Sequence, residues 1–304
     1  MTMPNVMLTG GTGLVGSKLC DKLLALNYKV FILTRGRSIK VSPNLSYVNW
    51  DIANKHVDKG ALPKKSEELF IIHLAGASVA DQRWTSSYKT KILNSRVDSL
   101  NFLLSLVGDQ CKHIVSASGV NYYFGPNTDK EFKEEDAADQ SSFLGQVCVE
   151  WEKAALENTY GIPAAVVRTG TVLSKRGGAF GIFKSLAKKG LLMPLGSGKQ
   201  WLPWIHNYDL CEMYIHLLEK RRTGAFNAVA SEQIIQKDFF KQLANKLNKW
   251  VWPPLAPKFA IKLAMGERAT IILNGAQIDN QKILDSGFKF KYPAVDKALD
   301  HLVK

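Results

Sequence analysis

The chain has 304 residues, of which 46% are apolar, and a formal net charge of +13 at pH 7. This length can bury a sizeable core and fits one α/β domain with a smaller appended lobe. No apolar run approaches the roughly 18 residues of a membrane span, and the basic residues form no dense tract, so we expect neither a membrane nor a nucleic-acid partner. The opening MTMPNVML leads straight into an apolar run without room for a signal peptide, so we expect a cytoplasmic protein.

A glycine-rich segment, TGGTGLVG at 9–16, lies between an apolar run and an amphipathic stretch. A Gly-rich turn between a strand and a helix can cradle a phosphate. Gly10 would allow the tight turn, Gly13 lets the backbone approach a pyrophosphate, and Gly16 lets helix and strand pack closely. We therefore predict a dinucleotide site here, contacted by Thr9, Gly10, Thr12, Gly13, Leu14 and Val15.

The next predicted strand, 29–33, ends in TRGRS. A carboxylate at this edge would hold a ribose 2′-hydroxyl, whereas a basic residue would accept a 2′-phosphate. There is no Asp or Glu between residues 21 and 51, and the edge carries two arginines and a serine, namely Arg35, Arg37 and Ser38. The pattern predicts NADP(H) as cofactor. The alternative is that both arginines are solvated loop charges.

Apolar, strand-like runs alternate with helix-compatible segments through the first two-thirds of the chain. The expected strands are 5–8, 29–33, 45–49, 69–74, 112–117 and 163–168, with helices such as 87–107 and 143–158 between them. Such alternation predicts an α/β fold, a Rossmann-type doubly wound parallel sheet. Later we expect a helix at 207–220, a strand at 225–229 and a helix at 236–249, the last with Phe239, Phe240, Leu243 and Leu247 on one face.

The predicted domain division follows this change of pattern. Residues 1–172 form the NADP-binding domain, with return elements from about 200–230, and residues 173–304 form a smaller C-terminal substrate lobe with a tail at about 250–304. The four cysteines, Cys20, Cys111, Cys148 and Cys211, lack CxxC spacing, and the histidines form no ligand pair at helical spacing. We expect buried thiols and no metal.

Several motifs at the ends of the predicted strands resemble those of the extended and atypical short-chain dehydrogenase/reductase families. They are TGGTGLVG, HLAGA at 73–77, SASGVNYY at 116–123, RTGTVL at 168–173 and WIHNYDL at 204–210. Two further stretches, RWTSSYKTKILNSRV at 83–97 and GFKFKYPAVDKAL at 287–299, are similar to the atypical subgroup called epimerase family protein, family 39U. That subgroup includes proteins described as SulA-like cell-division inhibitors.

The resemblance implies further cofactor contacts at Leu74, Ala75, Gly76, Arg168 and Gly170. Asp51 is expected to contact the adenine amine. The alternative is that Asp51 serves as the N-cap of a helix. The alternative for Arg168 is a structural role instead of a cofactor contact. Typical family members place a Tyr and a Lys four residues apart, so that the ammonium lowers the phenol pKa. Leu144 and Cys148 occupy these positions here, and members of the subgroup generally lack the pair.

The candidate catalytic residues are Ser118, Tyr122 and His206. Ser118 matches the family's Ser/Thr and could bond a substrate oxygen, while Tyr122 lies with Tyr123 in the loop over the cofactor. His206 could donate a proton at neutral pH. The alternatives are a pocket wall for the tyrosines and a hydrogen-bonded structural role for His206. Three tryptophans could wall a cleft or pack in the core: Trp84, Trp201 and Trp204.

Two functions remain open from the sequence. The first is an NADP(H)-dependent oxidoreductase or epimerase acting on an unknown small hydroxyl- or carbonyl-bearing substrate, with Ser118 orienting the oxygen. The second is a non-catalytic NADP(H)-binding regulatory protein that acts on a protein partner, as in cell division. The missing Tyr and Lys favour the second, while Ser118, the RTG turn and the aromatic residues favour the first, which we prefer.

Overall fold

The structure of the chain, a computed structural model, describes residues 4–65, 67–124, 130–251 and 255–304. Residues 1–3, 66 and 125–129 of the predicted domain, and residues 252–254 of the predicted tail, lie outside the described residues.

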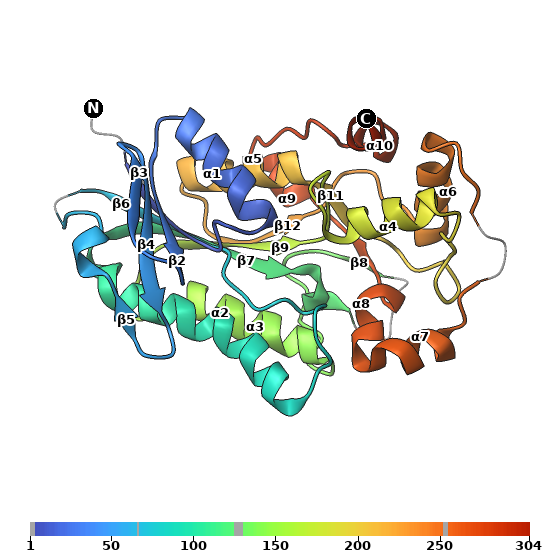
Figure 1. Ribbon diagram of the computed structural model, residues 1–304, viewed down its shortest axis with the longest axis horizontal. Helices are drawn as coiled ribbons and strands as arrows, with labels where there is room; N and C mark the ends of the chain where they lie inside the picture. The colour runs from blue at the N-terminus through green and yellow to red at the C-terminus, as the bar shows by residue number, and fades with distance from the viewer. Residues whose placement is uncertain (1–3, 66, 125–129, 252–254) are drawn as a thin grey trace.

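A mostly parallel sheet organises the first two-thirds of the chain (Figure 1). Its strands are β1 (Asn5–Thr9), β2 (Lys29–Thr34), β3 (Ile39–Ser42), β4 (Leu45–Asp51), β5 (His56–Val57), β6 (Leu69–His73), β7 (Cys111–Gly119), β9 (Ala164–Thr169) and β12 (Gly224–Ala228). The order is β12-β9-β7-β6-β1-β2-β4-β3, with β5 paired to β4, and only β3 and β5 run antiparallel to their neighbour β4. The chain winds outward from β1 in both directions, which confirms the predicted doubly wound α/β fold and opens a crevice at the carboxyl ends of β1 and β6.

Helices cover both faces of the sheet, and two apolar cores result. In Figure 1, α1 (Leu14–Ala25) and α5 (Asn207–Glu219) lie above the sheet, and α2 (Ser86–Val107) and α3 (Phe143–Leu156) lie below it. Val6 and Leu8 of β1 belong to the core on the α1 side, whereas Met7 between them belongs to the core on the α2 side. This alternation explains why β1 is apolar at successive positions, as is typical of a strand buried on both faces.

A third core lies in the C-terminal part of the chain, at the right of Figure 1. It joins α4 (Gly178–Lys188), α6 (Gln236–Lys246) and α10 (Val295–Val303). The remaining elements are β8 (Glu131–Phe132), β10 (Thr171–Leu173), β11 (Trp204–His206), α7 (Lys258–Met265), α8 (Thr270–Leu273), β13 (Gln277–Ile278) and α9 (Gln281–Asp285), with 3-10 turns η1 (Lys59–Ala61), η2 (Gly108–Gln110), η3 (Val120–Tyr123) and η4 (Gly266–Ala269). Phe239, Phe240 and Leu243 are buried on one face of α6 as predicted, with Leu247 partly buried.

Two elements that follow residue 172 pack with the sheet. Strand β12 pairs with β9, and α5 packs on α1. We keep the division at residue 172, with these return elements, as a proposal.

Helix α4 was not expected, since glycines at 177 and 178 predict a loop; both have positive φ and form the turn from which the helix starts. Within the described ranges, no helix combines the length and apolar character needed to cross a bilayer.

Candidate cofactor and substrate site

Two glycines of the glycine-rich loop, Gly10 and Gly16, stand where no side chain fits. Gly10 has φ +67°, and a Cβ there would lie 2.7 Å from the Leu74 carbonyl oxygen; a Cβ on Gly16 would lie 2.2 Å from the Gly10 oxygen. Gly13 is the N-cap of α1 and offers no side-chain cap, and the first turn holds no acidic residue. The amides at the start of this helix are therefore open to an anion. This cradle fits the diphosphate of a dinucleotide.

Thr9 acts inside the protein and holds the loop that follows β6. Its side chain is buried, and its Oγ1 accepts hydrogen bonds from the backbone N–H of Leu74 and of Ala75, each at 3.0 Å. The same oxygen lies 2.7 Å from Nδ1 of His73, and burial lowers the pKa of His73 to about 4. A neutral His73 can accept from this hydroxyl while its Nε2–H donates to the Arg96 carbonyl at 3.0 Å. Thr9, predicted as a cofactor contact, shapes the site through Leu74 and Ala75.

Arg96 of α2 lies beneath the same loop, and the sequence did not single it out. Its Nη1 donates to the carbonyls of Ala77 at 3.1 Å and Ile92 at 2.8 Å, and its guanidinium carbon lies 4.8 Å from the centre of the Trp151 ring. A Cβ on Gly76 would come within 2.9 Å of that carbon, so a larger residue there would have to displace the Arg96 guanidinium group. The only sequence signal was the SR dipeptide of the 83–97 motif.

The two predicted phosphate-binding arginines are exposed. Arg35 lines an open hollow of about 1170 Å³, and Arg37 lines a second hollow of about 700 Å³ that shares Asn49 and His56 with the first. Across the described ranges, neither guanidinium has a carboxylate within ion-pair distance. The N–H of Asn49 donates to Ser38 Oγ at 2.9 Å, and its Nδ2 donates to the carbonyl of residue 36 at 2.6 Å. These hydrogen bonds fix the turn, while the guanidinium groups of Arg35 and Arg37 remain accessible to an anion.

Asp51 also lines the larger hollow, but its carboxylate closes a turn. Oδ1 accepts from the N–H of Ala53 at 3.0 Å, and Oδ2 accepts from Asn54 Nδ2 at 2.7 Å. The hydrogen bonds from Asn54 hold the Asp51 pKa below its usual value. This geometry resembles the capping alternative, although the cap belongs to a turn rather than to a helix.

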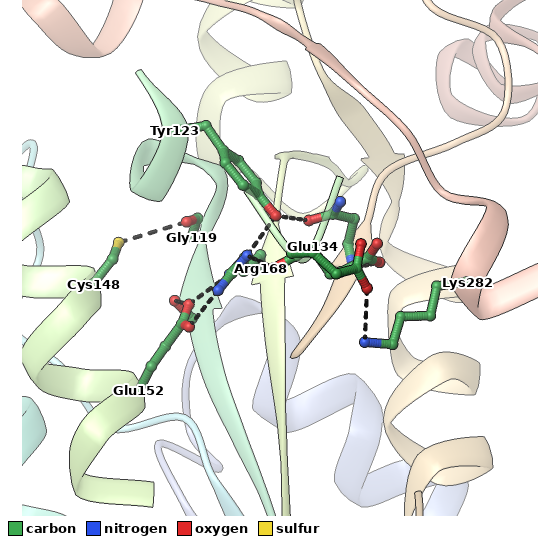
Figure 2. A network of polar contacts seen from close by, with 10 residues as sticks. Gly119, Tyr123, Glu134, Cys148, Glu152, Arg168 and Lys282 are labelled. Carbon is green, nitrogen blue, oxygen red and sulfur yellow. Dashed lines mark hydrogen bonds and ion pairs between the residues drawn. The ribbon is translucent and has the colours of Figure 1, made fainter. Parts of the chain in front are cut away.

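Arg168 is the centre of a buried polar network (Figure 2). Its Nε and Nη2 donate to the two carboxylate oxygens of Glu152 at 2.9 and 2.8 Å, and its Nη1 donates to the Tyr123 hydroxyl at 2.5 Å and the Glu134 carbonyl at 2.9 Å. Although burial alone lowers the pKa of Arg168, its hydrogen bonds to Glu152 raise it overall. Ser118 Oγ donates to Glu152 Oε1 at 2.7 Å. Arg168 and Ser118 therefore join β9 and β7 to α3. This geometry favours the structural alternative for Arg168, and the role of Ser118 at the substrate stays a prediction.

The network continues towards β12 through two aromatic residues. The Tyr122 ring lies 3.5 Å from the guanidinium carbon of Arg168, and Tyr123 donates its hydroxyl to Asn227 Oδ1 at 2.8 Å. Glu134 Oε1 accepts from the Asn227 N–H at 2.8 Å, and burial raises the pKa of this carboxyl. Lys282 Nζ lies 3.6 Å from the carboxylate of the next residue, Glu135. The Tyr122 ring thus packs against the guanidinium group of Arg168, which belongs to this structural network.

The positions of the missing Tyr and Lys lie on the buried face of α3. Leu144 and Cys148 are both buried, and Cys148 Sγ donates to the Gly119 carbonyl at 3.5 Å (Figure 2). Burial, with a smaller effect of Glu152, raises the pKa of the Cys148 thiol to about 11. Cys148 is therefore a neutral packing residue at pH 7. All four cysteines are buried and free.

His206 lies on β11, away from this network, and both of its ring nitrogens have partners. Nδ1 accepts from the Tyr208 N–H at 3.0 Å and caps α5, while Nε2 lies 3.1 Å from Nδ1 of His301 in α10. Burial, followed by the neighbouring His301, lowers the pKa of His206 to about 3. A histidine that acts as a proton donor must be protonated near neutral pH, whereas His206 is neutral there and both of its ring nitrogens are bonded. These observations favour the structural alternative.

A cavity of about 300 Å³ lies at the carboxyl edge of the sheet and reaches the C-terminal lobe. It touches Leu14 at the start of α1, Gly170 after β9, and Trp201. The expected catalytic residues Ser118, Tyr122 and His206 do not line it, whereas Asn121, Thr171 and Asn274 do, and sequence reasoning missed these three. Of the other tryptophans, Trp204 is buried in the third core and Trp84 packs edge-on against Phe143.

A doubly wound sheet with a glycine cradle, open arginines after β2 and a cavity beside β9 defines a dinucleotide-binding protein of the short-chain dehydrogenase/reductase class. The comparisons with known proteins place it more closely. The chain belongs to the NAD dependent epimerase/dehydratase family, whose model matches residues 6–229, and residues 256–302 match a domain of unknown function, DUF1731. The family predicted from the motifs is confirmed.

Relatives resemble the chain along nearly its whole length. An epimerase family protein of Staphylococcus saprophyticus is 34% identical over 311 residues, covering 99% of this chain and 100% of that protein. The chloroplastic homologue of epimerase family protein SDR39U1 from Arabidopsis thaliana is 31% identical, covering 97% of this chain and 85% of that protein.

Solved structures agree with this placement. The crystal structure of human epimerase family protein SDR39U1, determined with NADPH, superposes with a TM-score of 0.86 at 27% identity and 98% coverage of each chain. The UDP-glucose 4-epimerase of Thermotoga maritima, determined with UDP-glucose, superposes with a TM-score of 0.76 at 20% identity and 98% coverage of each chain, a likeness of fold.

Proposed function

We propose that this chain is an NADP(H)-dependent oxidoreductase or epimerase of the short-chain dehydrogenase/reductase type that acts on a small hydroxyl- or carbonyl-bearing substrate. The cavity of about 300 Å³ carries the proposal. It extends from Leu14, at the diphosphate cradle, to Gly170, at the end of β9. In doubly wound folds, ligands bind in the crevice at this edge of the sheet. A small substrate would thus lie beside the cofactor.

The residues that would hold NADPH are those left open by the fold. The loop from Gly10 to Val15 would bind the diphosphate, and Arg35, Arg37 and Ser38 would bind the 2′-phosphate. Leu74, Ala75 and Gly76 would line its path towards Gly170. NADPH in the human relative supports this choice of cofactor. When bound, the cofactor supplies or accepts the hydride that interconverts a carbonyl and an alcohol.

The chain itself would orient the substrate. Asn121 follows β7 and Thr171 follows β9, and both residues line the cavity. Their amide and hydroxyl groups can bond a substrate oxygen, but neither exchanges a proton readily at neutral pH. We therefore assign the proton to water, and Ser118 serves as a positioning residue that holds Glu152 against the end of β7.

The non-catalytic alternative has one observation in its favour. No Asp, Glu, His, Lys, Cys or Tyr side chain in the described part of the chain lines the cavity, and Cys148 stands where a Lys would act. A protein that binds NADP(H) to regulate a partner needs no acid or base there.

Single-turnover oxidation of bound NADPH, with a panel of aldehydes and ketones, separates the two functions. The enzyme proposal expects at least one member to oxidise NADPH, and Asn121→Leu to slow that reaction about tenfold or more, since about 1.4 kcal/mol corresponds to tenfold. Cys148→Ala is the control and should react as the unmodified chain does. If NADPH binds and no compound oxidises it, the regulatory function replaces the enzyme.

A further inference from the structure

The wall of the substrate cavity carries no charged side chain among the described residues. Its lining is apolar or uncharged polar: Leu14, Val120, Asn121, Phe124, Thr169, Gly170, Thr171, Val172, Gly178, Ala179, Phe183, Gln200, Trp201, Leu202, Pro203, Gln236, Ile271, Ile272 and Asn274. In a chain with a formal net charge of +13, a phosphate-binding cavity would be expected to recruit lysine or arginine. This one recruits neither.

Two polar side chains of the wall are used by the fold. Gln200 Nε2 donates to the carbonyls of Leu195 at 3.0 Å and Ile272 at 3.1 Å. Gln236 Oε1 accepts from the Leu195 N–H at 2.8 Å, and its Nε2 donates to the Ile272 carbonyl at 3.3 Å. These glutamines hold the far wall of the cavity together, so they offer little to a ligand.

Three polar side chains of the wall remain free for a ligand. Asn121, Thr171 and Asn274 line the cavity, and the structure shows no hydrogen bond from their side chains to another described residue. Asn121 and Thr171 follow β7 and β9, so they lie at the strand ends where the cofactor crevice opens. The cavity therefore offers neutral hydrogen-bonding groups within an apolar chamber.

Size and polarity restrict the ligand further. Small-molecule pockets span roughly 300–1,000 Å³, and this cavity lies at the lower limit, at about 300 Å³. Placing a diphosphate against the side chains of such a wall would leave its charges without a cationic partner, which is unfavourable. The wall has instead the aromatic and aliphatic surface that favours an apolar body, with Phe124, Phe183 and Trp201 on it.

Resting on the proposed function, we infer that the substrate is a small, neutral and largely apolar carbonyl or alcohol compound, and that Asn121 orients its oxygen. Nucleotide sugars are excluded from the cavity. This chain thus differs from its fold neighbour of Thermotoga maritima, whose structure holds UDP-glucose.

Calorimetric titration of the NADPH-loaded protein tests this inference with acetophenone, cyclohexanone, ethylbenzene and UDP-glucose as probes. We expect at least one ketone to bind, and UDP-glucose not to bind at the same concentration. Acetophenone should bind about tenfold more tightly than ethylbenzene, which has the same ring without the oxygen. In Asn121→Leu this difference should disappear while ethylbenzene binds as before.

A second pair of variants tests the apolar wall. Ile271→Arg places a cation in the cavity and should weaken ketone binding at least tenfold, whereas Ile182→Arg, at a position 62% exposed on α4, should leave it unchanged. NADPH affinity should stay the same in both. The inference is overturned if UDP-glucose binds more tightly than either ketone, or if neither ketone binds the loaded protein. If the unmodified chain does not bind NADPH at all, it is the proposed function that fails.

Discussion

Arg35 and Arg168 both stand at carboxyl ends of strands in one sheet, but their guanidinium groups have opposite surroundings. Arg35 is exposed at the end of β2 without a carboxylate partner in the described chain, whereas Arg168 is buried and bonded to Glu152, Tyr123 and the Glu134 backbone. At the predicted cofactor side of this sheet edge, the charged group of Arg35 remains free to bind a ligand. At the side that is catalytic in typical relatives, the charged groups of Arg168 and Glu152 instead bind each other and hold β9 against α3. A motif residue can thus mark a ligand site or a structural network, and its partners decide which.

The largest effect should come from breaking the buried network. Arg168→Met leaves Glu152 as a buried, unpaired carboxylate, so we expect the free energy of unfolding to fall by about 3–5 kcal/mol. Urea denaturation measures it. The control is Arg221→Met, since the ion pair of Arg221 with Glu68 is exposed and should contribute about 1 kcal/mol or less. A loss below 1 kcal/mol for Arg168→Met would show that the network does not hold this half together.

The next largest effect concerns the predicted cofactor side of the sheet edge, at the glycine-rich loop. Gly13→Val places a branched side chain where the diphosphate approaches, and NADPH affinity should fall at least about 100-fold, or about 2.8 kcal/mol. Gly13 has φ −79°, which valine also adopts, and a Cβ there would lie 3.2 Å from the Gly10 carbonyl oxygen, a contact that a small backbone shift relieves. We therefore expect the circular dichroism spectrum to be unchanged. Gly181→Val, where a Cβ meets nothing within 4 Å, is the matched control. Undiminished NADPH binding by Gly13→Val would remove the loop from the cofactor site.

Stability should also fall in mild acid. Burial lowers the pKa of His73 to about 4 and that of His206 to about 3, so the unfolded chain binds protons at pH 5.5 that the folded chain does not. The stabilisation is therefore complete above the unfolded histidine pKa and is lost as pH falls towards the folded values. We expect unfolding free energy about 2 kcal/mol lower at pH 5.5 than at pH 7. His206→Gln should reduce the slope of unfolding free energy against pH, whereas the same substitution at exposed His56 should not. Equal slopes for the two variants would contradict the role given to buried His206.

The smallest of these effects sharpens the role of the exposed arginine. Arg35→Glu replaces a phosphate acceptor with a ribose-binding carboxylate, so NADPH should lose at least about tenfold in affinity, or about 1.4 kcal/mol, and NADH should become the preferred nucleotide. Lys153→Glu makes the same charge change at an exposed position of α3. If both variants alter NADPH binding alike, net charge explains the effect and Arg35 has no specific role.

Local patterns were enough to predict the glycine-rich turn and the cofactor, while the individual contact residues stay predictions. The strand, turn and helix from β1 to α1 are contiguous in the chain, and the close approaches at Gly10 and Gly16 leave a glycine pattern that can be read without a structure. The exposed position of Arg35 follows from the turn that carries it, and its contact with the 2′-phosphate stays a prediction. The alternation of apolar strands with helix-compatible segments likewise predicted the doubly wound sheet.

The catalytic half could not be predicted in the same way. The roles of Ser118 and Arg168 depend on Glu152, which α3 brings to them from elsewhere in the chain. His206 faces His301, a residue almost a hundred positions away on α10. No local pattern encodes these partners. The far wall of the cavity comes from α8, a four-residue helix too short to leave a periodic pattern.

Calorimetric titration of NADPH and NADH into the unmodified chain tests the central claim most directly. If the open arginines after β2 form a 2′-phosphate site, NADPH binds at least about tenfold more tightly than NADH, a difference of about 1.4 kcal/mol. Equal affinities, or tighter binding of NADH, would contradict the account, because Arg35 and Arg37 would then be solvated charges without a ligand.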